Sequence, residues 1–506
     1  MRSYLLGLDN GGTVTKAGLY DETGAELAIA SRNTEMLFPE PGHTERDLTA
    51  LWNANVETIR EVILKSGVEP KEIVGVSVTG HGNGLYLLDA QGNDLGNGIV
   101  STDTRAVSYV EKWSADGTSA RAFEKTLSNV WAGQPPALMA WLRDNKPEIM
   151  QRAGHMLSCK DYVRYRLTGE ISSEITDLSG TGFMNIRTGA VDLELFALWG
   201  LQDYQQLVTT PVWSTDVAGT ITAETAALTG LPEGIPVAGG MFDIVAMAVA
   251  TGVLQPAQLC VIGGTWSINE FVSTSPVMGA DIAMNSLFCV PGHILVNDST
   301  PTSASNLEWF VSQLLGFGTA GEINRKDLYN QCNTMVQETD STESDVVFLP
   351  FLFGSNVHTR GSAAFVGMNG WHETRHLIRA VYEGIVFSHR THIDRLRARA
   401  PEAFTSIRIS GGVSRSNEWV QMFADVLQLP VEITAGDELG CLGSAIVAGV
   451  AAGVYPDVNH AISRAVQTRG VVQPNKSQAE IYQRKYERYR AVTEALSAVW
   501  DKHELT

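Results

Sequence analysis

Carboxylates and hydroxyls stand beside glycine pairs at several points of the chain, and such groupings are suited to phosphate chemistry. The first grouping is Asp9-Asn10-Gly11-Gly12-Thr13-Val14-Thr15-Lys16. Glycines allow backbone N–H groups to surround an anion, threonine hydroxyls donate to phosphate oxygens, and Asp9 could hold Mg²⁺ through water. The segment also suits a plain hairpin turn, because Asn-Gly and Gly-Gly are common hairpin signals. Alone, it leaves both interpretations open.

Further glycine turns follow later strand-like runs. One is Ile262-Gly263-Gly264-Thr265-Trp266-Ser267, another is Gly411-Gly412 with Asn417 near the start of the next helical pattern, and a third is Gly440 with Gly443. The Gly11-Gly12 and Gly263-Gly264 turns could together bind one polyphosphate. The start of a helix, as near Asn417, offers free N–H groups. Each turn taken singly is more often structural. The spacing of a P-loop is absent from the sequence, so a Walker-type nucleotide site is not indicated.

A carboxylate in the segment Gly239-Gly240-Met241-Phe242-Asp243 lies where a short strand meets a helical pattern. At such a place Asp243 could accept the proton of a hydroxyl during phosphoryl transfer. An aspartate that stabilises the first turn of the helix is an equally ordinary interpretation.

Polar residues suited to a substrate with several hydroxyls follow strands in the first third of the chain. They are His81 and Asn83 in HGNG, Asp103 and Arg105 in STDTRA, and Trp131 in WAGQP. His81 could instead be a turn residue, Asp103 and Arg105 a local ion pair, and the tryptophan a core residue.

Alternating strand and helix patterns must position these groups. Strands are predicted over residues 4–9, 16–21 and 26–31, with a helix over 47–67 and a strand over 73–80. The same alternation returns late in the chain, where SIRISGG predicts a strand, NEWVQMFADVLQL a helix and VEIT a second strand. A chain of 506 residues is too long for one ordinary core. We therefore predict two lobes, with the boundary after residue 248.

Composition narrows the classes of partner. With 37 basic and 56 acidic residues, the formal net charge is -19, which repels nucleic acid and anionic membranes. The five cysteines are scattered without a CxxC pair, so neither a disulfide framework nor a zinc site is indicated. The first apolar run stops at Asp9, short of a signal peptide or membrane span. We expect a cytoplasmic enzyme that binds small molecules and neither nucleic acid nor membrane.

Taken together, the motifs resemble the FGGY family of carbohydrate kinases. The family's carboxy-terminal signature is similar to residues 363–368 and 376–383, which are separated by seven residues. Its amino-terminal signature is similar to residues 133–145. The order LDNGGT, GGMFD, GGTW, GGVSRSN, ELGCLGSA also agrees. This resemblance implies an α/β fold of two RNase H-like lobes, of the actin, hexokinase and Hsp70 ATPase superfamily, with a cleft between them.

The resemblance also implies roles for the residues named above. Residues 1–248 would bind the sugar and supply the catalytic base Asp243, and residues 249–506 would bind the nucleotide. ATP and Mg²⁺ are the implied cofactors, Asp9 the implied metal ligand, and a homodimer is a possible assembly. The implied sugar contacts are His81, Asn83, Asp103, Arg105, Trp131 and Asp243, and the implied ATP contacts are Gly11, Gly12, Thr13, Lys16, Gly264, Thr265, Gly411, Gly412 and Asn417.

Within the family the chain resembles the L-xylulose kinase branch, which includes enzymes for L-xylulose and 3-keto-L-gulonate, through PTSASNLEWF, FLPFLFGSN and YEGIVFSHRTHIDRLR. That branch has Gln and Lys where this chain has His81 and Asn83, and loss of a cation beside the sugar argues against an acidic sugar. The expected activity is ATP-dependent phosphorylation of a small ketose, L-xylulose or a related ketopentose. D-xylulose, D-ribulose and an erythritol-like polyol stay open as substrates, as does a non-catalytic ATP-binding member of the same fold.

Overall fold

The computed structural model describes residues 3–279, 282–315, 325–436 and 438–502, which fall into two compact units. The first unit takes in residues 1–254, 272–296 and 438–467, and the second takes in residues 255–271, 297–437 and 468–506. Because these segments interleave, a single cut along the chain does not describe the units. The assignment of residues 1–248 and 249–506 to a sugar-binding and a nucleotide-binding lobe stays a prediction.

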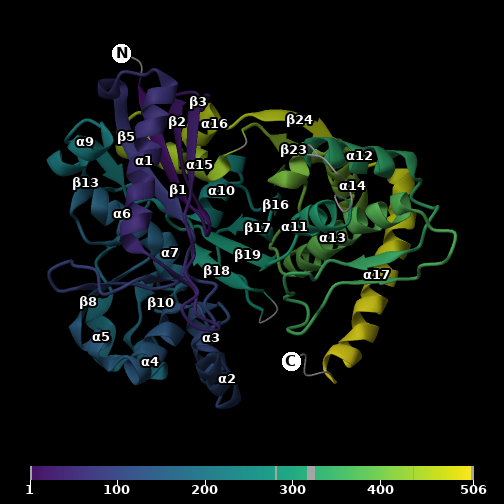
Figure 1. Cartoon of the computed structure of the whole chain (residues 1–506), viewed down its shortest axis with the longest axis horizontal. Coiled ribbons are helices and arrows are strands. Elements are labelled where there is room, and N and C mark those ends of the chain that lie inside the picture. The colour runs from purple at the N-terminus through teal and green to yellow at the C-terminus, as the bar shows by residue number, and fades with distance from the viewer. Residues whose placement is uncertain (1–2, 280–281, 316–324, 437, 503–506) are drawn as a thin grey trace. The chain divides into compact units, whose positions relative to one another are not determined.

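The first unit is built on a mixed seven-stranded sheet (Figure 1). Its strand order is β13-β14-β5-β1-β2-β3, and β15 pairs with β5 beyond β14. Strands β1, β2 and β3 form the predicted antiparallel meander, and β1 pairs in parallel with β5. The bounds are β1 Tyr4–Asn10, β2 Val14–Asp21, β3 Glu26–Asn33, β5 Ile73–Gly80, β13 Val217–Thr220, β14 Pro236–Ala238 and β15 Met241–Phe242.

Two helices from opposite ends of the sequence pack on this sheet. Helix α1 (Leu48–Ser66) packs on β2 and β3. Asp47 caps its start and Gly67 follows its end, in agreement with the predicted helix over residues 47–67. Helix α15 (Leu439–Ala451) packs on β1 and β5. A Cβ atom at Gly7 of β1 would lie 1.9 Å from the carbonyl oxygen of Cys441, so only glycine allows α15 to approach the strand this closely.

The remaining elements of the first unit include a second cluster of buried apolar residues around α4, together with four small two-stranded sheets. The helices are α2 Val107–Ala115, α3 Thr118–Thr126, α4 Pro135–Asn145, α5 Pro147–Arg152, α6 Cys159–Thr168, α7 Ile175–Gly180, α8 Leu193–Leu198, α9 Ala223–Thr229, α10 Asp243–Thr251 and α16 Val458–Ala465. The small sheets pair β4 (Glu45–Arg46) with β7 (Gly98–Ile99), β6 (Tyr86–Asp89) with β8 (Ala153–Leu157), β9 (Ser173–Glu174) with β12 (Pro211–Val212), and β10 (Met184–Asn185) with β11 (Ala190–Val191).

A second mixed seven-stranded sheet has the order β18-β19-β17-β16-β22-β23-β24. Strands β16 and β17 form an antiparallel hairpin, and β16, β22 and β23 pair in parallel. This repeats the pattern of β1, β2 and β5 in the first sheet. The bounds are β16 Gln258–Gly263, β17 Ser267–Ser273, β18 Met284–Leu287, β19 Ile294–Thr300, β22 Ser406–Ser410, β23 Val431–Thr434 and β24 Thr468–Val472.

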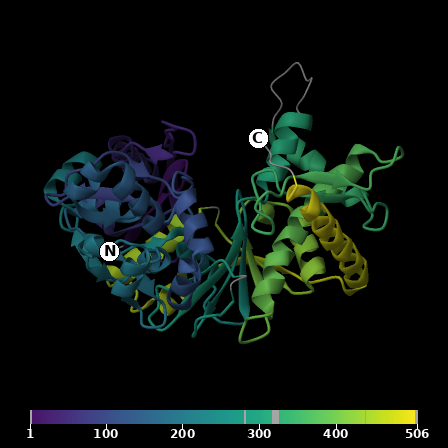
Figure 2. The same ribbon diagram turned by 90° about the horizontal axis from the view of Figure 1, so that it is seen from below.

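Helices of the second unit gather around α13 (Thr374–Arg397), which packs against α12 (Arg325–Glu338) and α14 (Asn417–Leu427). The long yellow helix in Figure 2, α17 (Ala479–Trp500), packs against α13, α14 and β20. The predicted strand, helix and strand of the late part of the chain are thus confirmed as β22, α14 and β23. The other elements are α11 Ser305–Phe310, β20 Val347–Leu349 and β21 Ala364–Val366.

Candidate active site

The turn between β1 and β2 carries the first predicted phosphate contacts. The amide of Gly11 donates to the carbonyl of Val14 at 3.1 Å, and the carbonyl of Thr13 accepts from the amide of Thr34 at 2.8 Å. The side-chain oxygen of Asn10 accepts from the Thr15 hydroxyl at 3.0 Å and from Asn55 at 2.8 Å. The base of the turn is therefore braced from inside, while Thr13 at its tip is exposed.

Arg46, in the short strand β4, also holds this turn and was not among the residues predicted for the site. Its guanidinium is buried and donates to the carbonyl oxygens of Gly11, at 3.0 Å, and Gly12. Two carbonyls held by one planar cation fix how the glycine peptides face. No local pattern indicates this contact, because Arg46 lies 34 residues along the chain from Gly12.

Asp9 is the penultimate residue of β1 and lies near an ion pair. Lys16 pairs with Glu438 at 2.5 Å, and a Cβ atom at Gly440 would lie 2.3 Å from the Asp9 carboxylate. Burial raises the pKa of Asp9 to about 6, with Lys16 opposing the rise and Glu438 adding to it. Lys16, a predicted ATP contact, thus has its ammonium engaged by a carboxylate of its own unit.

Asp243 is the first residue of α10, directly after the two-residue strand β15. One carboxylate oxygen accepts from the amide of Ile244 at 2.8 Å. Burial, and then the negative charges of Asp9 and Asp177, raise the pKa of Asp243 well above its ordinary value. The structure therefore brings the predicted base and the predicted metal ligand close enough to interact electrostatically, and adds Asp177, which the sequence analysis did not single out.

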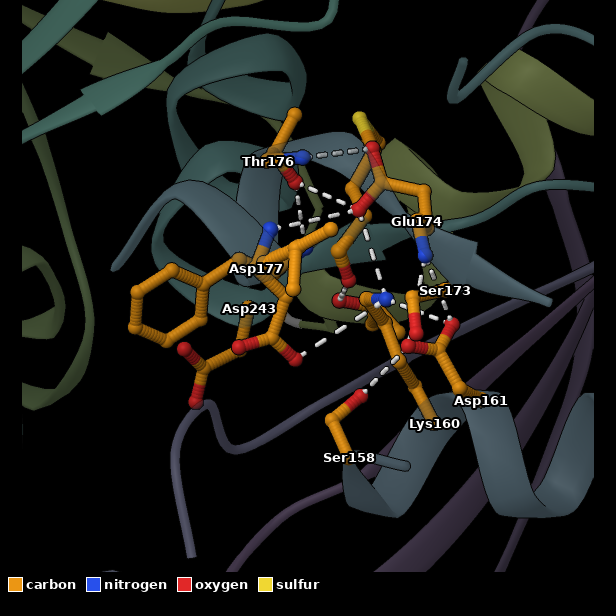
Figure 3. A network of polar contacts seen from close by, with 12 residues as sticks. Ser158, Lys160, Asp161, Ser173, Glu174, Thr176, Asp177 and Asp243 are labelled. Carbon is orange, nitrogen blue, oxygen red and sulfur yellow. Dashed lines mark hydrogen bonds and ion pairs between the residues drawn. The ribbon is translucent and has the colours of Figure 1, made fainter. Parts of the chain in front are cut away.

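A network of buried charges lies beside Asp243 (Figure 3). The ammonium of Lys160 lies 2.8 Å from Asp161, 3.3 Å from Glu174 and 3.8 Å from Asp177. Arg164 also pairs with Asp161, at 2.7 Å. These side chains are almost inaccessible to water, so each charge depends on the others for its stabilisation.

The charge of Asp177 gives the fold a pH dependence. Burial raises its pKa to about 6, with Lys160 opposing the rise and Asp161 adding to it. A carboxyl with a raised pKa holds its proton more tightly in the folded state, so its contribution to stability is present below about pH 4 and is lost as the pH rises to about 6. We expect Asp177→Asn, which resembles the neutral form, to melt roughly 2–4 °C above the wild type at pH 8 and at the same temperature near pH 4.

Thermal denaturation between pH 4 and pH 8 measures this difference. Asp144→Asn is the control, because hydrogen bonding to Arg143 lowers the pKa of Asp144 and reverses the expected sign. A gain for Asp177→Asn that did not change with pH would contradict the electrostatic explanation.

The predicted sugar contacts His81 and Asn83 are buried in the loop after β5. The amide of Asn83 donates to Asp177 at 3.2 Å, and among the described residues its side-chain oxygen has no hydrogen-bond partner. His81 lies 3.1 Å from the Tyr86 hydroxyl, and burial, followed by the charge of Arg46, lowers the pKa of His81 to about 3. The loop thus offers neutral polar groups of the kind that bind sugar hydroxyls.

Asp103 and Arg105 form the local ion pair that the sequence left open, at 2.9 Å. Arg105 also pairs with Glu45 at 2.8 Å, and Asp103 accepts from the amide of Thr44. Trp131 is partly exposed in the turn before α4. Their roles toward a sugar stay predictions.

The nucleotide contacts predicted in the second unit lie on two glycine turns. Gly264 and Thr265 connect β16 to β17, and the Thr265 carbonyl accepts from the Ser305 hydroxyl at 3.1 Å. Gly411 has a φ of 82°, and a Cβ atom there would lie 2.8 Å from the carbonyl of Gly263. The two turns therefore meet. Gly412 and Asn417 are exposed, the latter at the start of α14.

A Mg²⁺ ion would fit the carboxylates of the first unit. Within the described ranges, three or more metal-binding side chains do not gather at one point. Mg²⁺, however, is usually held by one or two carboxylates together with substrate phosphates. The repulsion between Asp9 and Asp243 is what such a cation would relieve.

Across the helices that the structure describes, none has the length and apolar character needed to cross a membrane.

Comparison with known proteins places these features in a family. The models of the N-terminal and C-terminal domains of the FGGY family of carbohydrate kinases match residues 4–250 and 259–452. The chain is 36% identical to the L-xylulose/3-keto-L-gulonate kinase of Escherichia coli over 98% of both chains. It is 36% identical to a probable L-xylulose kinase of Pasteurella multocida over 98% of this chain and 100% of the relative. The crystal structure of xylulose kinase from Rhodospirillum rubrum has a TM-score of 0.87 and 28% identity, covering 99% of this chain and 100% of that one.

Two mixed sheets, each of which contains a hairpin with a glycine turn, define the α/β fold of the actin-like ATPases. The chain belongs to the FGGY family of carbohydrate kinases, as its sequence motifs predicted. It is a sugar kinase of the phosphotransferases with an alcohol acceptor, and ATP is the phosphate donor of this family.

Proposed function

We propose that this chain transfers the γ-phosphate of ATP to a hydroxyl of L-xylulose, with Asp243 as the general base. The observation that carries the substrate is the 36% identity, over 98% of the chain, to an enzyme named for L-xylulose and 3-keto-L-gulonate. The observation that supports the base is the position of Asp243 at the start of α10, beside Asp9 and Asp177.

Charge favours the neutral sugar over the acidic one. Asp9, Asp177 and Asp243 form an acidic group, and a sugar carboxylate beside it would be repelled. The nearby cations are engaged, since Arg46 donates to the glycine carbonyls and Lys160 pairs with carboxylates of the buried network. Of the two substrates named for the relative, L-xylulose is therefore the better fit.

Asp243 is suited to the proton transfer because of its raised pKa. A base is most effective when its pKa approaches the working pH, and burial beside two other carboxylates raises that of Asp243 in this direction. In the proposed reaction Asp243 accepts the proton of the attacking hydroxyl. Asn83 and the neutral His81 orient the sugar through hydrogen bonds, and Thr13 donates to a phosphate oxygen.

Asp9 is the proposed Mg²⁺ ligand of the first unit. The ion, when bound with ATP, neutralises charge on the phosphates. The remaining proposed nucleotide contacts are Gly11, Gly12, Lys16, Gly264, Thr265, Gly411, Gly412 and Asn417.

The substrate proposal is tested by ADP release from the purified protein with ATP and Mg²⁺. The panel contains L-xylulose, D-xylulose, D- and L-ribulose, 3-keto-L-gulonate, glycerol and erythritol, with a sugar-free sample as the control. We expect L-xylulose to give the largest kcat/KM. A larger value for another sugar would overturn the choice of substrate and would leave the role of Asp243 unchanged.

A homodimer stays a prediction, which sedimentation equilibrium of the same preparation tests.

A further inference from the structure

The peptide between Met241 and Phe242, one residue before Asp243, is held in place by two threonine hydroxyls. Strand β15 has only two residues, and both pair with β5. The hydroxyl of Thr79 in β5 donates to the carbonyl of Met241 at 2.7 Å. The amide of Phe242 donates to the hydroxyl of Thr176 in α7 at 3.0 Å. The direction in which the chain enters α10 therefore depends on side chains that lie far away in the sequence.

The hydroxyl of Thr176 is itself fixed by a carboxylate. It donates its only proton to Glu174 at 2.7 Å, so it must act as an acceptor toward Phe242. Glu174 in turn accepts from the Ser214 hydroxyl at 2.7 Å and lies 3.3 Å from the Lys160 ammonium. Figure 3 shows Thr176 and Glu174 at one end of this buried network, with Asp243 beside it.

We propose that Thr176 is a positioning residue for Asp243. Its hydroxyl, held by Glu174, accepts from the Phe242 amide and so fixes the peptide between Met241 and Phe242. The proposal rests on the role of Asp243 as the general base. Loss of the hydroxyl leaves a buried amide without its acceptor, and the peptide is then free to turn toward another partner. A displacement of the base by even about 1 Å is enough to slow a reaction about 10²-fold.

Two substitutions at this position separate the hydroxyl from the shape of the side chain. Thr176→Val keeps the shape and removes the hydroxyl, whereas Thr176→Ser keeps the hydroxyl. Thr181→Val is the matched control, because Thr181 is also buried at the end of α7 and donates only to the Leu178 carbonyl.

For Thr176→Val we expect the rate of phosphoryl transfer in a single turnover to fall about 10- to 100-fold, with the KM for sugar within about threefold of the wild type. Thr176→Ser and Thr181→Val should stay within about threefold in both quantities. Should the valine variant not fold, Thr176→Cys replaces it. The thiol bonds weakly, and a several-fold loss of rate is expected there.

A double-mutant cycle with Asp243→Asn separates positioning from a structural role. If Thr176 acts through Asp243, the valine substitution causes no further loss of rate in the Asp243→Asn background. An equal loss in both backgrounds, or a wild-type rate for Thr176→Val or Thr176→Cys, would overturn the inference. A wild-type rate for Asp243→Asn alone would instead show that the assignment of the base is wrong.

Discussion

Replacing Asp243 with asparagine lowers the turnover number by at least about 10²-fold while the sugar still binds, because asparagine cannot accept a proton from the attacking hydroxyl. The amide oxygen can still accept from the Ile244 amide, as the carboxylate does at 2.8 Å, so the start of α10 is kept. The raised pKa of Asp243 also predicts that kcat/KM of the wild type falls on the acid side at a pH above the ordinary pKa of aspartate. The measurements are steady-state kinetics and calorimetric sugar binding.

The control for this substitution is Asp47→Asn. Asp47 caps the start of α1 and accepts from the Ala50 amide at 2.7 Å. Asparagine is an equally good residue at a helix start, so this variant keeps its activity. If Asp243→Asn were as active as Asp47→Asn, Asp243 would be a helix-start residue and no base.

Replacing Lys160 with methionine destabilises the fold by about 3–5 kcal/mol, because it removes one partner of a buried charge network. Asp161 keeps its pair with Arg164, but the ion pairs of Glu174 and Asp177 described above are both with Lys160. Two carboxylates would remain buried with their counter-charge removed. Thermal and urea denaturation measure the loss.

Lys125→Met is the matched control for this prediction. Lys125 also pairs with two carboxylates, Asp192 at 2.7 Å and Glu194 at 2.6 Å, but its side chain is 26% exposed. Surface pairs contribute about 1 kcal/mol or less, so the control stays close to the wild type. Equal losses in the two variants would show that burial does not make the Lys160 network important.

The fold could be predicted well where the sequence signals are local. The alternating runs over residues 4–31 and the capped helix after Asp47 were each recognisable from a few neighbouring residues, and they appear as β1, β2, β3 and α1. Gly239 and Gly240 likewise placed Asp243 at a strand–helix junction. The interleaving of the two units was not predictable, because α15 packs on β1 more than four hundred residues away.

The motifs of the site could be predicted from the sequence, but the residues that hold those motifs in place could not. The supporting residues lie in segments whose polar residues look like those of ordinary surface helices and loops. They are Arg46, Lys160, Glu174, Thr176 and Asp177. Their function depends on tertiary contacts, such as that of Thr176 with Phe242, sixty-six residues along the chain. Periodicity along one sequence reports burial of a helix face and does not report which distant backbone atom a hydroxyl meets.

Phosphorus NMR of the wild-type protein with ATP, Mg²⁺ and L-xylulose tests most directly that this chain is a kinase acting on that sugar. The predicted result is a new phosphomonoester resonance that grows in step with ADP and is absent without the sugar. Inorganic phosphate growing in step with ADP, with or without the sugar, would contradict it and would indicate a nucleotide hydrolase built on the same fold.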